Sequence, residues 1–219
     1  MNNPFATALE TTVSTLVDRQ GLEIHYRKLE KVGSSYDGIG YHFPDPMKGL
    51  KDRIILPQMD ISKLSEQQKK YYNAWLYHEL LHKMKSDKGV VEQADNKNLM
   101  TKNLLNYLED ARIEINTNKN LKGANEHLLF YRLEQGREIA TELPYAHKNR
   151  WAWIMQAYKY KLPGYNDIPI PEDLQKDFDI GWEILNKDNR FNKACLKDQE
   201  GCLDVFMLAL EMIEAWQLN

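Results

Sequence analysis

The chain has 219 residues and a formal net charge of -3, and 42% of its residues are hydrophobic while 28% are charged. This length allows one large domain with a buried core, and the composition is that of a globular protein rather than a disordered or fibrous one. Charges of both signs are interspersed along the chain. Nucleic acid and an anionic membrane surface are therefore not expected as partners.

The sequence contains no apolar run near the roughly 18 residues that a membrane-spanning helix needs. Its first ten residues, MNNPFATALE, have neither the basic nor the apolar segment of a secretory signal. The two cysteines, Cys195 and Cys202, have a spacing that fits neither a redox motif nor a zinc finger, so we expect them to be reduced. These features predict a cytoplasmic protein.

The first third of the chain alternates between short structured segments and turns. Residues 4–18 carry apolar side chains at helical spacing, and residues 22–26 (LEIHY) alternate as in a strand. Glycine, serine and proline then mark turns, before a second strand is predicted over residues 53–60 (RIILPQMD). Because Pro57 lacks an N–H, we expect this second strand at the edge of a sheet.

The remainder of the chain reads as helices. Ser65 and Gln68 form a capping-box pattern that predicts a helix from there to about Lys85. A second long helix is predicted over residues 98–118, and others over 125–141, 148–160, 171–187 and 202–217. The expected fold class is therefore α+β and mainly helical. We expect a metal-binding domain over residues 1–130, with residues 131–219 as a helical extension packed on it in one structural unit.

Residues 78–82 read HELLH, which is an HExxH motif on the first long helix. On a helix, His78 and His82 lie one turn apart on the same face, so both imidazoles can bind one metal ion. Glu79 lies near the ion without having to bind it, where it can take a proton from a water molecule. The HExxH pattern also occurs by chance on solvated helices, so a metal site can be predicted from it only if a third ligand is present.

The acids of the segment LNYLEDARIEI (105–115) are the strongest candidates for that third ligand. Glu109 follows His82 by 27 residues, and both Glu109 and Asp110 flank the apolar face of their helix. We predict Glu109, because its longer side chain suits reach from a neighbouring helix. The alternative for this pair of acids is a capping role or an ion pair with Arg112.

Other residues are weaker candidates for the third ligand. Asp87 is too close in sequence to His78 for the chain to return it to the ion without a sharp turn. His127 and His147 are isolated histidines, of the kind that more often lie on the surface or in the core.

Four blocks of the sequence together resemble the cobaltochelatase CobT-type family, which includes bacteriophage proteins. These blocks are residues 3–26, 77–87 (YHELLHKMKSD), 104–114 (LLNYLEDARIE) and 120–128. The resemblance implies a zincin-like, gluzincin-type metallopeptidase domain, usually joined to a von Willebrand A-type domain and paired with a MoxR-type AAA+ ATPase. The A-type domain needs a DxSxS motif, and the nearest segment, DISKL (60–64), lacks its last serine.

The function expected from motif and resemblance together is zinc-dependent peptide hydrolysis by a protein of phage origin, in the host cytoplasm. His78, His82 and Glu109 would bind Zn²⁺, and Glu79 would act as general base on a zinc-bound water. Residues 53–59 would pair with an extended protein or peptide substrate. The alternative is a non-catalytic, metal-stabilised adaptor that works with a MoxR-type ATPase or a phage assembly.

Two supporting roles complete this hypothesis. Asp110 or Asp87 would orient a ligand histidine through its second ring nitrogen. A side chain that stabilises the developing oxyanion of the substrate is also needed. The candidates for this role are Tyr131, Tyr145, His127 and His147.

Overall fold

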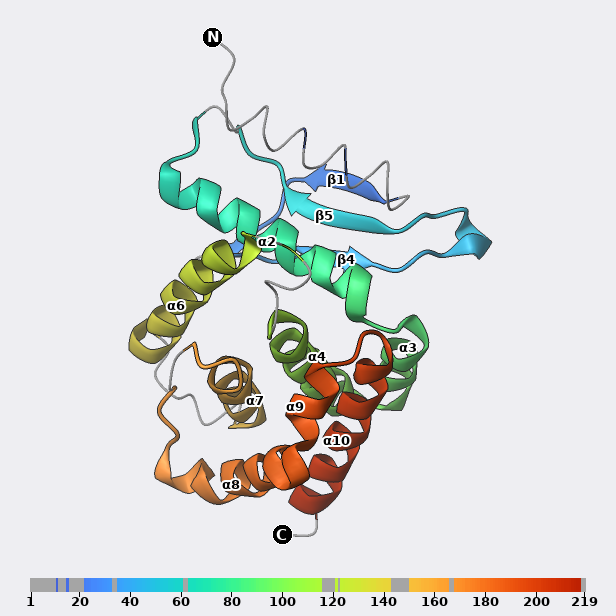
Figure 1. The fold of residues 1–219 in the computed structure, drawn as a ribbon. Helices are drawn as coiled ribbons and strands as arrows, with labels where there is room; N and C mark the ends of the chain where they lie inside the picture. Colours follow the sequence, from blue (N-terminus) through green and yellow to red (C-terminus); the bar gives the residue numbers. More distant parts are fainter. Residues whose placement is uncertain are drawn as a thin grey trace.

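The computed structural model describes residues 22–32, 35–60, 63–115, 121, 123–142, 150–165 and 168–217, together with residues 11 and 15. In this part of the chain the fold is mainly helical with one small three-stranded sheet, which confirms the α+β class. The sheet lies at one end of the molecule and the C-terminal helices at the other (Figure 1). The helix expected over residues 4–18 lies almost wholly outside the described residues.

The sheet consists of β1 (Glu23–Arg27), β5 (Arg53–Pro57) and β4 (Gly40–His42) in the spatial order β1-β5-β4. β1 is parallel to β5 and β4 is antiparallel to it, while β2 (Lys31–Val32) and β3 (Ser35–Tyr36) form a separate two-stranded ladder. Both predicted strands are thus confirmed.

The prediction that the strand with Pro57 lies at the sheet edge is wrong, because β5 is the central strand. The pairing between β4 and β5 ends at Ile55, which lies opposite Gly40. Pro57 projects two residues beyond that point, so its missing N–H removes no hydrogen bond from the β4 side. The edge strand on this side of the sheet is therefore β4.

Helix α2 (Glu66–Lys85) begins at the predicted capping box. The Ser65 Oγ accepts from the Gln68 N–H at 3.2 Å, and the Gln68 Oε1 accepts from the Ser65 N–H at 2.8 Å. The buried face of α2 packs on the sheet in one hydrophobic cluster, in which Trp75 and Leu80 join Ile54. Burial of this face fixes the rotation of α2 and hence the direction in which its histidines point.

The other helices follow the predicted positions closely, with two additions that the sequence did not reveal. They are α3 (Lys88–Lys97), α4 (Leu99–Glu114), α6 (Ala124–Glu142), α7 (Arg150–Lys161), α8 (Glu172–Asn186), α9 (Arg190–Cys195) and α10 (Glu200–Gln217), with 3-10 turns at Pro46–Lys48 and Lys187–Asn189. The additions are α3 and α9. Helix α3 buries only Val90 and Ala94, too few positions for an apolar period to be visible.

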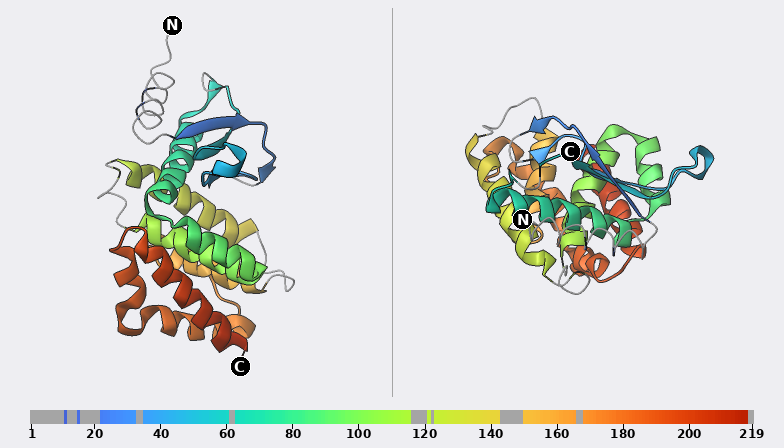
Figure 2. Two further views of the ribbon diagram at one scale, coloured as in Figure 1. Left: turned by 90° about the vertical axis from the view of Figure 1, so that its right-hand side faces the viewer. Right: turned by 90° about the horizontal axis from the view of Figure 1, so that it is seen from above.

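Helix α4 lies between the two halves of the molecule (Figure 2). Ile113 near its end packs in the cluster of the sheet and α2, whereas Leu104 and Leu108 pack in the cluster of the C-terminal helices.

The boundary expected at residue 130 falls inside α6. No helix in the described ranges is long and apolar enough to cross a membrane. Cys195 and Cys202 are buried free thiols.

Candidate metal centre

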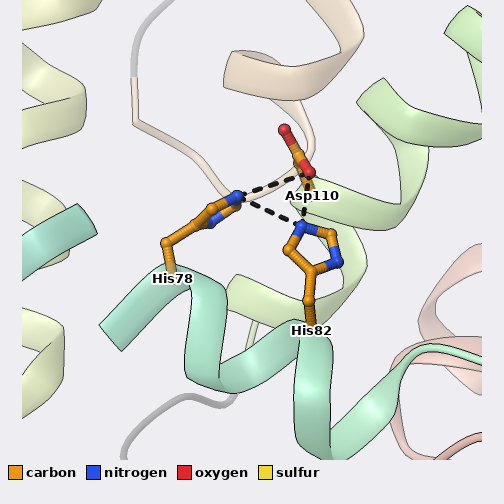
Figure 3. A group of neighbouring side chains, drawn as sticks. All are labelled: His78, His82 and Asp110. Atoms are coloured by element: carbon orange, nitrogen blue, oxygen red, sulfur yellow. Dashed lines mark hydrogen bonds and ion pairs between the residues drawn. The ribbon is translucent and has the colours of Figure 1, made fainter. Parts of the chain in front are cut away.

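Two histidines of α2 and one acid of α4 point toward a common centre (Figure 3). The His78 and His82 Nε2 atoms lie 3.2 Å apart. The Asp110 Oδ1 lies 3.4 Å from the first and 3.0 Å from the second. The ligand atoms of the three residues all lie within 4.8 Å of one another, and this group can hold a metal ion. Two imidazoles and a carboxylate are a common donor set for divalent transition metals.

The acid in this group is Asp110, so the prediction of Glu109 as third ligand is not met by the geometry. Neighbouring residues of a helix point about 100° apart, and α4 is turned so that Asp110 faces α2. The Glu109 carboxylate instead accepts from the Arg112 Nε at 2.7 Å and from the Arg112 Nη2 at 2.8 Å. The alternative considered for these acids, an ion pair with Arg112, therefore describes Glu109. This pair is fully buried rather than exposed.

Arg112 anchors Glu109 firmly. Its guanidinium also donates to the backbone oxygens of Lys85, Lys197 and Asp198, at 2.7, 3.0 and 3.0 Å. The side chain thereby joins the end of α2 to the turn between α9 and α10. Its charge and its N–H groups are satisfied inside the protein, as a buried arginine requires.

The outer nitrogen of each histidine is held by an acceptor. The His78 Nδ1 lies 2.6 Å from the Glu114 Oε1, and Glu114 in turn pairs with the buried Arg132 of α6. Such a carboxylate partner fixes the ring orientation and leaves Nε2 free for a metal.

His82 is held through a longer chain of contacts. Its Nδ1 lies 2.9 Å from the Ser86 Oγ, which donates to the Glu109 Oε1 at 2.8 Å. Glu109 is thus linked to the His82 ring through a serine. Asp87, expected as an alternative for this orienting role, instead caps α3 by accepting from the Val90 N–H. In the structure, Asp110 therefore lies in the group that can hold an ion, and Glu109 contacts the histidine-bound serine.

The buried charges of the centre stabilise one another. Burial by itself would raise the pKa of Asp110, but Lys159 and His78 together hold that pKa well below its usual range. Burial would likewise lower the pKa of His78, but Asp110 and Glu114 outweigh it and raise the pKa to about 9. Arg132 and His78 outweigh burial at Glu114 and hold the pKa of that carboxyl far below its usual range. The acids are therefore ionised at neutral pH.

Glu79 is buried beside the histidines, and its Oε2 accepts from the Tyr41 backbone N–H at 2.7 Å. Tyr41 belongs to the edge strand β4, and its phenol donates to the Asp52 Oδ1 at 2.5 Å. Asp52 also pairs with Lys83 of α2. These contacts hold β4 against the helix that carries the HExxH motif.

A cavity of about 540 Å³ lies over this centre. Its lining includes the three ligand candidates and Glu79, residues 39–43 along β4, and side chains from α3, α4, α6 and α7. Of the side chains considered for oxyanion stabilisation, Tyr131 lines the cavity, and its phenol oxygen accepts from the Gln135 Nε2 at 2.5 Å. His127 stacks on the Tyr77 ring instead. Tyr145 and His147 lie outside the described residues.

Sequence reasoning missed four residues of the centre: Ser86, Glu114, Arg132 and Lys159. Two of them carried a usable signal. Ser86 follows His82 by one helical turn, and Glu114 follows Asp110 by one turn, so each shares a helix face with a residue of the site. No local pattern marks Arg132 or Lys159, which reach the centre from α6 and α7.

No protein-family model, curated protein or solved structure matches the chain.

Proposed function

We propose that the protein is a zinc-dependent metallopeptidase of zincin-like type, with His78, His82 and Asp110 as the metal ligands. The observation that carries the proposal is the position of Glu79. It lies in the same cavity as the three ligand candidates but outside the group that can hold the ion. A purely structural zinc site is usually closed by four protein ligands and has no use for such an acid.

The residues of the chain would divide the reaction between them. A bound zinc ion would polarise the substrate carbonyl and lower the pKa of a water molecule toward neutrality. Glu79 would accept the proton of the attacking water and pass it to the leaving amine, as a general base and then a general acid. Glu114 and Ser86 would keep the two histidine rings in the orientation that presents Nε2 to the ion.

An extended polypeptide suits the cavity beside the edge strand. Among the described residues, β4 pairs with β5 and with no strand on its other side, and residues 39–43 line the cavity. A peptide added along this edge would gain backbone hydrogen bonds from groups other than the Tyr41 N–H, which already donates to Glu79, without demanding a particular sequence. This edge replaces residues 53–59, which we expected to bind substrate, because residues 53–57 of that segment form the central strand.

The resemblance to the CobT-type family supports the same assignment and carries the further proposals of a phage origin and a MoxR-type ATPase as partner. If the ion has no catalytic task, the same centre would serve the non-catalytic adaptor that we considered as the alternative. Activity of the purified protein separates the two functions.

The test is a Glu79→Gln variant. The amide oxygen can still accept the hydrogen bond from Tyr41, so fold and zinc content should match the wild type while peptidase activity falls by about 10²–10⁴-fold. Glu92→Gln, an equal change at an exposed position of α3, is the matched control and should stay active. Unfolded polypeptides are the substrate, with zinc content and melting temperature measured in parallel. A zinc-loaded wild type that cleaves nothing, or a Glu79→Gln protein with full turnover, would reject the peptidase.

A further inference from the structure

One residue of the C-terminal helices enters the centre directly. Lys159 lies on α7, its side chain is 15% exposed, and it lines the cavity. Its ammonium pairs with the Asp110 Oδ2, and it lies 5.6 Å from the centre of the Tyr107 ring. The pair joins α7 to α4 at the point where the ligand atoms converge.

The two oxygens of Asp110 therefore have different partners. Oδ1 faces the Nε2 atoms of His78 and His82, and Oδ2 faces Lys159. A carboxylate can bind a metal ion through one oxygen or through both. A charge-assisted hydrogen bond to one oxygen favours binding through the other alone.

Lys159 differs from the other cations that pair with acids of α4, because its partner acid belongs to the group that can hold the ion. Arg112 binds Glu109 and Arg132 binds Glu114, and in both pairs the acid holds a histidine in place without belonging to the ligand group. Asp110 is the one acid of these three pairs whose carboxylate is itself in that group. A protonated lysine has no lone pair, so its ammonium cannot itself become a ligand.

We propose that Lys159 is a positioning residue of the metal centre: by binding the Asp110 Oδ2, it leaves only Oδ1 for the ion. The ion then has three protein ligand atoms, and the fourth tetrahedral position stays open to solvent. The inference rests on the proposed function, since an open position is what a hydrolytic centre requires and a structural one does not.

The proposal predicts an unusual pair of effects when the lysine charge is removed. In Lys159→Met, both oxygens of Asp110 become free to bind, and a positive charge close to the ion disappears. Zinc should therefore bind more tightly, by about tenfold or more, although the centre becomes worse suited to hydrolysis. A merely structural lysine would give the opposite result, because loosening its surroundings weakens metal binding.

The experiment compares the full-length wild type with Lys159→Met, Lys159→Arg and Lys161→Met. Lys161 lies on the same helix but over the rings of Phe178 and Trp182, so Lys161→Met is the matched control. Zinc affinity is measured by competition with a chromophoric chelator. Coordination is read from the visible absorption of the Co²⁺-substituted protein, which is intense for four ligands and weak for five.

We expect Lys159→Met to bind zinc more tightly and to move the Co²⁺ spectrum toward higher coordination. Lys161→Met and Lys159→Arg, which keeps the charge and the donors, should retain the wild-type spectrum. An unchanged spectrum, or weaker zinc binding, in a folded Lys159→Met protein would overturn the proposal. If Lys159→Met does not fold, a folded Lys159→Arg protein with raised coordination would overturn it instead. A wild type that binds neither ion would reject the metal centre itself, which is a separate failure.

Discussion

The assignment of Asp110 rather than Glu109 to the metal can be decided by two substitutions that remove one carboxylate charge each. Asp110→Asn removes the negative charge from the group that can hold the ion. Glu109→Gln removes the negative charge from the buried ion pair with Arg112. The two residues are neighbours on α4, both are almost fully buried, and both changes are nearly isosteric. Differences between the variants therefore report on the partners of each acid rather than on its size.

The effect of Asp110→Asn should fall mainly on the ion. Structural zinc sites bind with about 10–16 kcal/mol over four ligands, so one ligand contributes about 3 kcal/mol, or more than about 100-fold in affinity. The metal-free fold should lose less stability than after Glu109→Gln. Lys159 keeps some contact with water, and His78, which Asp110 also stabilises, can give up its proton, so neither partner is left as a buried unpaired charge. The loss of a charge-assisted hydrogen bond costs about 1–3 kcal/mol.

The effect of Glu109→Gln should fall mainly on the fold. Arg112 is completely buried, and removing its acid leaves an uncompensated charge, which costs about 3–5 kcal/mol. The three backbone oxygens that Arg112 also contacts favour the lower end of this range. Metal affinity should fall by about 10- to 100-fold only, because the loss reaches His82 through Ser86.

Two assays on the same samples separate these outcomes. Urea unfolding in the presence of EDTA gives the free energy of unfolding of the metal-free protein, and chelator competition gives the zinc affinity. The order of the two variants should be reversed between the assays. If Glu109→Gln loses zinc while Asp110→Asn retains it, the arrangement of the centre is wrong and the expectation from sequence is right.

Two further predictions concern protons and packing. Because the pKa of His78 is raised from 6.5 to about 9, its protonated form stabilises the metal-free fold below about pH 6.5, and that contribution is lost as the pH rises through the raised value. Zinc needs the neutral ring, so zinc binding at pH 7 should release a proton. The zinc affinity should also rise about tenfold per pH unit up to the raised pKa of His78. A zinc titration in which a pH indicator shows no proton release would contradict this. Gly201→Ala should lower the free energy of unfolding by about 1–3 kcal/mol, because the added carbon would lie 2.4 Å from the Ala194 oxygen and 2.6 Å from the Arg112 Nη1. An unchanged or raised midpoint of urea unfolding would show that Gly201 does not lie this close to Ala194 and Arg112.

The sequence was informative where the determining interactions are local. The capping box at Ser65, the strand at residues 22–26 and the histidine pair of α2 each depend on residues within a few positions of one another, and each is found where it was predicted. The apolar face of α4 is also confirmed, since Leu104 and Leu108 are fully buried. Local spacing decides these features because a helix or strand fixes which neighbours share a face.

The sequence was misleading where two elements must be placed against each other. Glu109 and Asp110 are adjacent, and the choice between them depends on the rotation of α4 relative to α2, which the packing of the C-terminal helices sets. The same limit explains the error at Pro57. Its place in the sheet depends on how far β4 extends along β5, and no property of the proline itself reveals that.

The partners of the four acids separate Glu79 from the other three. Glu109, Asp110 and Glu114 each have a cation as partner, whereas the partner that holds Glu79 is the backbone N–H of Tyr41. The N–H of Tyr41 fixes the orientation of the Glu79 side chain, whereas the three cations fix acids that move no proton in the proposed reaction. The edge strand β4 therefore has two tasks in the proposed reaction. It would align an extended substrate, and it holds Glu79, the base that would take a proton from the attacking water.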